Sequence, residues 1–255
     1  MIIRSHQDRF IMIQQHDHAA ISGKAAEMWD NTLFSGQDRR SSVEYAIRNH
    51  DIGWKFMDEA PFWNDQTDAP YTFTDYPTEP KTVLYRYGIE EVARTDQYAA
   101  LLCNRHYMRF LHQNTSDAAQ KFIREQNAWH EKIVHSIGDF NPSDYAFHYG
   151  ILQLLDDLSL FLCLNERGVS KENEHPFFRH GITIRDELTA MTADKMCIYW
   201  KDSQTVHLDP FPFRKDFTVT LKQRTVTKEA IEQNGLLDSY RNASVENIDI
   251  ALTQA

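Results

Sequence analysis

Residues 47–54, with the sequence IRNHDIGW, place a histidine and an aspartate side by side at the end of a helix-like segment. Val43, Ile47 and His50 share one face of that helix, so His50 ends an apolar stripe that points into the core. A core-facing imidazole needs a partner for at least one ring nitrogen. A divalent cation shared with Asp51 would satisfy both side chains, so the pair predicts a metal site if other segments supply further ligands.

Other helix-like segments carry histidines and carboxylates in comparable positions. Asp156 lies within an apolar stripe of residues 143–164, where an isolated buried carboxylate is costly and a cation is a usual remedy. His106 and His130 each share a face with apolar residues of their own helix, and His18 begins a further apolar stripe. The candidate metal ligands, in chain order, are His18, His50, Asp51, His106, His130 and Asp156.

Several alternatives stay open at this point. His16 competes with His18 for the first ligand position, and Asp157 competes with Asp156 for the last. His130 is equally well explained as a half-buried helix histidine that hydrogen-bonds a neighbour. Because the chain contains 12 histidines, coincidence alone can place some of them on apolar faces.

Apolar spacing of three and four residues predicts the elements that must position these side chains. Helices are expected at residues 18–29, 42–51, 89–111, 116–135 and 143–164. Residues 64–81, rich in Thr, Asp and Pro, predict a long surface loop, which we interpret as a cover over the site. The segment FIMI near residue 10 suggests a short strand or a buried lead-in to the first helix.

The expected fold is mainly α, a helical bundle with a small antiparallel β element near the C-terminus. The β element is expected because MCIYW, TVHLD and FTVTL, after residue 195, are rich in residues that favour strands. We predict a helical domain over residues 1–194, with the loop insertion at 64–81. Residues 195–255 would form a β-containing extension packed on the same domain.

Composition limits the classes of function. The chain has 255 residues, 42% of them hydrophobic, which is enough for one sizeable core. Its net charge of −10 and the lack of a Lys/Arg block disfavour nucleic acid as a partner. No segment predicts a signal peptide or a membrane span, so a cytoplasmic protein without membrane partners is expected, acting on a small molecule and compatible with a homodimer. The three cysteines, Cys103, Cys163 and Cys197, are expected to be buried thiols.

The motifs together resemble those of the HD superfamily of metal-dependent phosphohydrolases. IRNHDIGW is similar to that superfamily's His-Asp motif, and LLDDLSL is similar to its last motif, which places the ligand on Asp156. DHAAISGKAA resembles the first motif through His18, and members with two metals add two further histidines. The resemblance covers about residues 14–165 and implies an α-helical bundle. The sequence pattern also resembles that of a bacterial family of unknown function with a Q-x-DHA motif near its N-terminus.

The ligand set indicates the chemistry. Imidazoles and carboxylates suit one or two ions of Mn, Fe, Zn, Co or Ni better than Mg. A bound ion activates water as a nucleophile and polarises a phosphoryl oxygen, as phosphoester hydrolysis requires. Asp51 is the natural bridge between two ions, and we expect Asp51 and His106 to be catalytic. The cations nearest in sequence, Arg48, Lys55, Arg105 and Arg109, are expected on the solvent side of their helices.

Three functions compete on this basis. The first is an HD-type phosphohydrolase acting on a small phosphorylated or nucleotide-like substrate. The second is an HD-type di-iron oxygenase, which needs His106 and His130 as iron ligands. The third is a sensor or binding module of HD type without catalysis, acting through its C-terminal β element.

Overall fold

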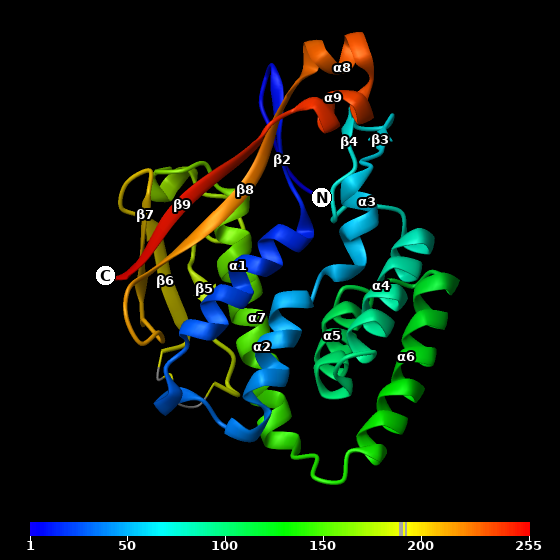
Figure 1. Ribbon diagram of the computed structural model, residues 1–255, viewed down its shortest axis with the longest axis vertical. Coiled ribbons are helices and arrows are strands. Elements are labelled where there is room, and N and C mark those ends of the chain that lie inside the picture. The colour runs from blue at the N-terminus through cyan, green and yellow to red at the C-terminus, as the bar shows by residue number, and fades with distance from the viewer. Residues whose placement is uncertain (189–190, 192) are drawn as a thin grey trace.

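The computed structural model describes residues 1–188, 191 and 193–255, in which a group of helices lies beside a seven-stranded sheet (Figure 1). The strand order is β1-β2-β8-β9-β7-β6-β5, and all neighbours are antiparallel except β7 and β9, which are parallel. The strands are β1 (Ile2–Ser5), β2 (Arg9–Ile13), β5 (Ile182–Thr183), β6 (Lys195–Trp200), β7 (Thr205–Asp209), β8 (Phe217–Thr227) and β9 (Val245–Gln254). A separate hairpin joins β3 (Trp63–Asn64) to β4 (Ala69–Pro70).

The two long strands β8 and β9 form the centre of the sheet. Buried and exposed side chains alternate along the first part of β8, as expected for a strand with one face against the core. The short helices α8 (Lys228–Asn234) and α9 (Leu236–Asn242) connect β8 to β9. On the other side of β8, β2 pairs in register from Arg9 opposite Thr227 to Met12 opposite Arg224. Residues from both ends of the chain therefore build one sheet.

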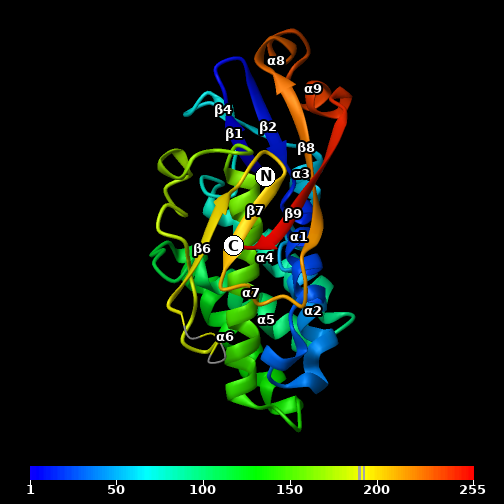
Figure 2. The same ribbon diagram turned by 90° about the vertical axis from the view of Figure 1, so that its left-hand side faces the viewer.

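The helices form the larger part of the core. They are α1 (Gln15–Met28), α2 (Arg40–Asn49), α3 (Lys55–Glu59), α4 (Thr78–Ala93), α5 (Gln97–Arg109), α6 (Asp117–Ser136) and α7 (Pro142–Leu164). Helix α1 contacts α2, α7 and β8, so it connects the helical layer to the sheet. Viewed from the side of the sheet, strands β6, β7 and β9 lie in front of α7 (Figure 2).

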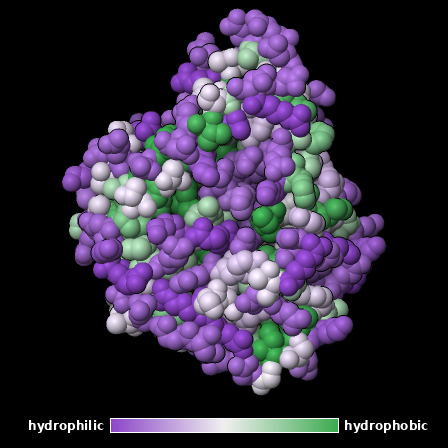
Figure 3. All heavy atoms as spheres, in the orientation of Figure 1, coloured by the Kyte–Doolittle hydropathy of each residue, from purple (hydrophilic) through white to green (hydrophobic). Residues whose placement is uncertain are grey.

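Helix α7 is the central element of this core. It is long and apolar enough to cross a membrane by length and composition, but 89% of its most apolar window is buried in the fold. It is therefore a core helix. On the surface, the face in Figure 3 is mainly hydrophilic, with apolar side chains scattered over it. The exposed large apolar residues are Phe56, Phe62, Val83, Phe110, Phe177, Leu237 and Val245.

The predicted fold class is wrong. A mainly α, all-α bundle with a small antiparallel β element does not describe a chain whose seven strands form one large mixed sheet. The short strand β1 was missed. The alternative of a strand at FIMI corresponds to β2, which becomes part of a sheet only by pairing with β8, more than two hundred residues away. The β7–β9 pair is also parallel, not antiparallel. Such long-range pairing leaves no periodic signal in a local window.

Three local predictions also need correction. The single helix expected at residues 89–111 is two helices, because Asp96 caps the start of α5 by accepting from the backbone N–H of Ala99. The segment 64–81 is not one loop, since it contains β4 and the first turn of α4. Cys197 is exposed rather than buried, because the alternation along β6 turns its neighbours Met196 and Ile198 inward.

Candidate metal centre

Five side chains from four helical segments meet in the core between the helices. His18 comes from α1, the His50–Asp51 pair from the end of α2, His106 from α5 and Asp156 from α7. They form two overlapping groups, His18–His50–Asp51 and His50–His106–Asp156, and the ligand atoms within each group all lie within 4.8 Å of one another. All five side chains are buried.

His50 stands at the centre of this cluster. Its ring lies 5.0 Å from that of His18 and 4.9 Å from that of His106, measured between centroids. Its Nε2 atom is 3.4 Å from Oδ1 of Asp156 and 3.9 Å from Oδ2 of Asp51. The imidazole therefore faces both carboxylates at once, the place where a cation would be stabilised most.

Backbone contacts fix the orientation of the His50 ring. Its Nδ1 lies 2.7 Å from the carbonyl oxygen of Ile47, and because a carbonyl only accepts, Nδ1 carries the proton. Nε2 is then the only ring nitrogen that can bind an ion. A hydrogen bond from the non-ligating nitrogen to a backbone carbonyl is the usual support of a metal-binding histidine. His50 can consequently serve one ion, not two.

The remaining polar atoms of the cluster show whether a cation fits. Nε2 of His50, both ring nitrogens of His106 and Oδ2 of Asp156 are buried without a hydrogen-bond partner among the described residues. Buried polar atoms are nearly always satisfied in native proteins, so several orphaned atoms in one place call for an explanation. A divalent ion would satisfy Nε2 of His50, Nε2 of His106 and Oδ2 of Asp156 together, since the last two atoms face each other at 4.0 Å.

The charge states of the cluster follow from burial and from mutual contact. Burial lowers the pKa of a histidine, but the adjacent carboxylates of Asp156 and Asp51 outweigh burial and raise the pKa of His50 to about 9. For His106 burial prevails, and its pKa falls to about 3 although the charge of Asp156 acts in the opposite direction. Burial alone would raise the pKa of Asp51, but contacts with the histidines hold it below its ordinary value.

The turn that carries the His-Asp pair depends on a glycine. A Cβ atom at Gly53 would lie 2.3 Å from the backbone carbonyl oxygen of Leu84, far closer than atoms can pack. Helix α4 can therefore approach the turn only where no side chain intervenes. The backbone N–H of Gly53 also donates to the hydroxyl of Tyr107, at 3.3 Å. Both contacts hold the end of α2 against α4 and α5, and so hold His50 and Asp51 in place.

Comparison with known proteins gives a family but no function. Residues 1–228 match the family model described as "Protein of unknown function (DUF3891)". The chain belongs to this family. No curated protein and no solved structure matches it. Nothing in these comparisons links the DUF3891 family to the HD superfamily, so that resemblance stays a prediction.

The DUF3891 structure decides between the ligand positions that the sequence left open. His18 enters the cluster, whereas His16, two residues earlier, lies partly buried outside both groups. Asp156 enters it, and Asp157 does not. His130 belongs to neither group either, and its ring packs beside Tyr145, with 5.6 Å between centroids. Five of the six predicted ligands thus meet in one place, and metal binding by them stays a prediction.

Two residues that support the cluster were not predicted. The amide of Gln15 donates to Oδ2 of Asp51 at 3.0 Å, and the hydroxyl of Ser159 lies 2.8 Å from Nδ1 of His18. Their signals were present in the sequence, since Gln15 opens the Q-x-DHA pattern and Ser159 ends the D-x-L-S pattern. The segment 64–81, predicted as a cover, contributes no residue to either ligand group.

Ser159 sets the tautomer of His18. Because it donates its only proton to the carbonyl oxygen of Asp156, at 2.9 Å, it accepts from Nδ1–H of His18. Nε2 of His18 faces Oδ2 of Asp51 at 3.0 Å, so a bound ion would replace this contact and be shared by the two atoms. We expect Ser159→Ala to weaken metal affinity by about 10- to 100-fold, the usual cost of losing such a partner. Titration of the metal-free variant with Mn²⁺ tests this. Unchanged affinity in a folded variant would show that Ser159 does not position His18.

One predicted cation lies closer to the cluster than expected. Nη2 of Arg109, on α5, is 3.9 Å from Oδ2 of Asp156, and its Nη1 is buried without a hydrogen-bond partner among the described residues. The expectation that Arg109 faces only solvent is therefore wrong. In this DUF3891 member a guanidinium stands beside the ligand cluster.

Proposed function

We propose that this protein is a metal-dependent phosphohydrolase of the HD type that acts on a small phosphorylated or nucleotide-like substrate. The observation that carries the proposal is the meeting of five buried ligand-type side chains, of which His50, His106 and Asp156 have nitrogen or oxygen atoms without a hydrogen-bond partner among the described residues. Their order along the chain is the order that the HD resemblance implies. The guanidinium of Arg109 beside Asp156 supports an anionic substrate.

The residues of the two groups would hold the ion. Three imidazoles and two carboxylates suit Mn, Fe, Co, Ni or Zn better than Mg. When bound, such an ion lowers the pKa of a coordinated water toward about 7 and polarises a phosphoryl oxygen. Because His50 offers only Nε2, we expect about one tightly held ion per chain.

The chain's own residues prepare this chemistry in three ways. The Gln15 amide fixes Oδ2 of Asp51, which keeps that carboxylate turned toward the cluster. His106 is neutral at physiological pH because its pKa is lowered to about 3, so a ring nitrogen is available to ligate a cation. Burial of the cluster excludes bulk water, which strengthens every charge interaction within it. We propose Asp51 and His106 as the residues that carry the catalytic step.

The experiment combines metal content with turnover. The full chain, purified without a histidine tag, should contain about one equivalent of transition metal by plasma mass spectrometry. After dialysis against a chelator and addition of Mn²⁺, Co²⁺, Zn²⁺ or Fe²⁺, it should release inorganic phosphate from members of a panel of nucleotides and phosphate monoesters. The chelated protein should release none. Bound metal without phosphate release from any panel member would contradict the proposal.

The competing functions have less support. The di-iron oxygenase needs His106 and His130 together, and His130 lies in neither ligand group. A non-catalytic module gives no reason for orphaned nitrogens and a carboxylate oxygen to be buried in one place. We also propose that the enzyme is cytoplasmic and acts on a small molecule. The net charge of −10 disfavours nucleic acid as a substrate.

A further inference from the structure

A polar cleft opens beside the ligand cluster. Its volume is about 580 Å³, within the usual range for small-molecule sites. It is lined from α5, α7 and the segment around β5 by Arg105, Arg109, His112, Tyr149, Gln153, Thr183, Ile184, Arg185, Asp186 and Glu187. Arg109 belongs to both places, since it lines the cleft and lies 3.9 Å from Oδ2 of Asp156. Arg109 thus connects the cleft to the ligand cluster.

The three arginines of the cleft come from two separate parts of the chain. Arg105 precedes Arg109 by one helical turn, which places it about 6 Å farther along α5. Its guanidinium lies over the Tyr149 ring, 4.2 Å from the centroid, so stacking holds it in place. Arg185 reaches the cleft from the segment that follows β5, where it packs beside Gly150 of α7.

These guanidinium groups have no close carboxylate partner among the described residues. Among the described residues, Arg105 and Arg185 form no ion pair within 4.0 Å, and the contact of Arg109 with Asp156 is at the limit of that distance. The carboxylates of Asp186 and Glu187 also line the cleft but form no ion pair with these arginines. Arginines that converge without partners are the usual means of binding phosphate or carboxylate groups, often through two nitrogens at once.

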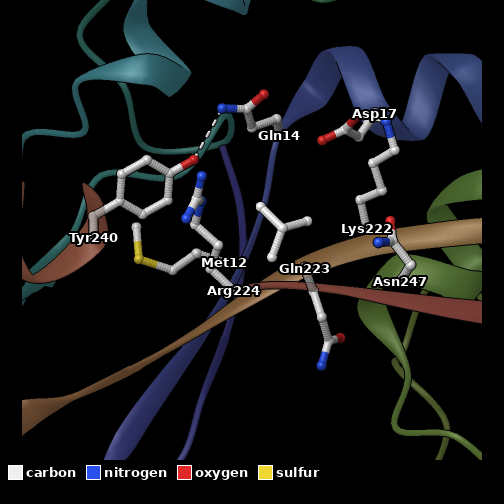
Figure 4. Close-up of a pocket in the computed structure, with 9 residues that line it drawn as sticks. Met12, Gln14, Asp17, Lys222, Gln223, Arg224, Tyr240 and Asn247 are labelled. Atoms are coloured by element: carbon white, nitrogen blue, oxygen red, sulfur yellow. Dashed lines mark hydrogen bonds and ion pairs between the residues drawn. The ribbon is translucent and has the colours of Figure 1, made fainter. Parts of the chain in front are cut away.

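A second basic pocket in the molecule provides the contrast. It lies between the start of α1, strands β2, β8 and β9, and α9, with a volume of about 400 Å³ (Figure 4). Its two cations already have partners: Lys222 lies 3.7 Å from Oδ1 of Asp17, and Arg224 donates to the carbonyl oxygen of Ala243. Arg224 also lies over the Tyr240 ring. This pocket therefore offers little free charge for an anion.

We propose that the arginine cleft binds a second anionic group of the substrate, so that the enzyme selects small phosphoesters that carry another phosphate or carboxylate. The inference rests on the proposed function, because it takes the reacting phosphate to lie at the ligand cluster beside Arg109. Arg105 and Arg185 extend the positive charge beyond the span of one phosphate group. They hold the far end of the substrate, while Asp186 and Glu187 accept hydrogen bonds from its hydroxyl groups.

Calorimetry with two non-hydrolysable probes tests this proposal. Methylenediphosphonate carries two phosphonate groups and methylphosphonate carries one. The metal-loaded full chain should bind the first at least about tenfold more tightly than the second, as two charge-assisted contacts require. Arg105→Gln and Arg185→Gln should each remove most of this advantage and leave methylphosphonate affinity within about twofold of wild type, since a contact that is not made contributes nothing.

Lys222→Gln is the matched control, because it removes the same charge from the other basic pocket (Figure 4). It should change neither affinity. If the diphosphonate keeps its full advantage in both arginine variants, it binds by chelating the metal alone, and the proposal is overturned. Equal losses in Lys222→Gln would show a general effect of net charge and would overturn it as well.

The proposal can fail separately from the proposed function, because binding requires no turnover. In chelator-treated protein, methylenediphosphonate should still bind, more weakly, with the same dependence on Arg105 and Arg185. If the protein is inactive but binds methylenediphosphonate in this way, the anion-binding cleft is supported and the proposed hydrolase function is refuted. If the protein is an active hydrolase whose binding does not depend on the arginines, the function is supported and the anion-binding cleft is refuted.

Discussion

Asp156→Asn is expected to lose the bound metal and at least about a hundredfold of phosphohydrolase activity, since even the loss of an outer partner of a metal ligand costs 10- to 100-fold. The carboxylate is buried, with Oδ1 3.4 Å from Nε2 of His50 and Oδ2 4.0 Å from Nε2 of His106. Asparagine keeps the shape of the side chain but removes its charge and one of its two acceptor oxygens. Metal content and phosphate release measure the two losses.

Asp157→Asn provides the control, because it makes the same chemical change one residue away. Burial and the neighbouring charge of Asp156 raise the pKa of Asp157 to about 7, so at neutral pH the substitution removes only about half a charge. Asp157 lies in neither ligand group, and this variant should keep its metal. Metal loss in Asp157→Asn, with retention in Asp156→Asn, would exchange the two roles and contradict the cluster described above.

Metal affinity should rise about tenfold for each pH unit between pH 7 and the pKa of His50, because one proton must leave before the ion binds. In the metal-free protein His50 has a pKa of about 9, so at pH 7 it is an imidazolium between two carboxylates. The positively charged imidazolium then occupies the position between the carboxylates that the metal ion would take. His106, with its pKa lowered to about 3, has no proton to release in this range.

Titration with Mn²⁺ in two buffers of different ionisation enthalpy measures the proton release. About one proton per ion should leave at pH 7. The stability of the metal-free protein provides an independent check. The raised pKa of His50 contributes stability that is complete below its unfolded value of 6.5 and is lost as the pH rises through about 9. Constant metal affinity from pH 7 to 8.5, without proton release, would refute this account of His50.

Local patterns predicted which side chains enter the cluster better than they predicted the fold. The apolar stripes ending at His50 and containing Asp156 are properties of single helices, where residues three and four apart share a face. Each stripe shows that a polar side chain points into the core, whatever that helix packs against. For this reason the His-Asp pair and Asp156 could be found from the sequence.

The sheet could not be predicted in the same way. β2 has only five residues, and it is stabilised by pairing with β8, at the other end of the chain. The break between α4 and α5 depends on one capping residue, Asp96, within a long run of helix-forming residues. In both places the decisive contact is a single hydrogen-bonding partner or a distant strand, and neither changes the apolar spacing of the segment.

The sequence by itself determined which residue types face the core and on which helices they lie. Only the tertiary structure decided which of them meet. His130 lies on an amphipathic helix much as His106 does, yet the packing of α6 places it beside Tyr145. Arg109 was expected on the solvent side of α5, yet the packing of α7 brings Asp156 to it. Helical periodicity fixes the direction in which a side chain points around the axis of its own helix. A metal centre also depends on how several helices are placed relative to one another, and only long-range packing sets these positions.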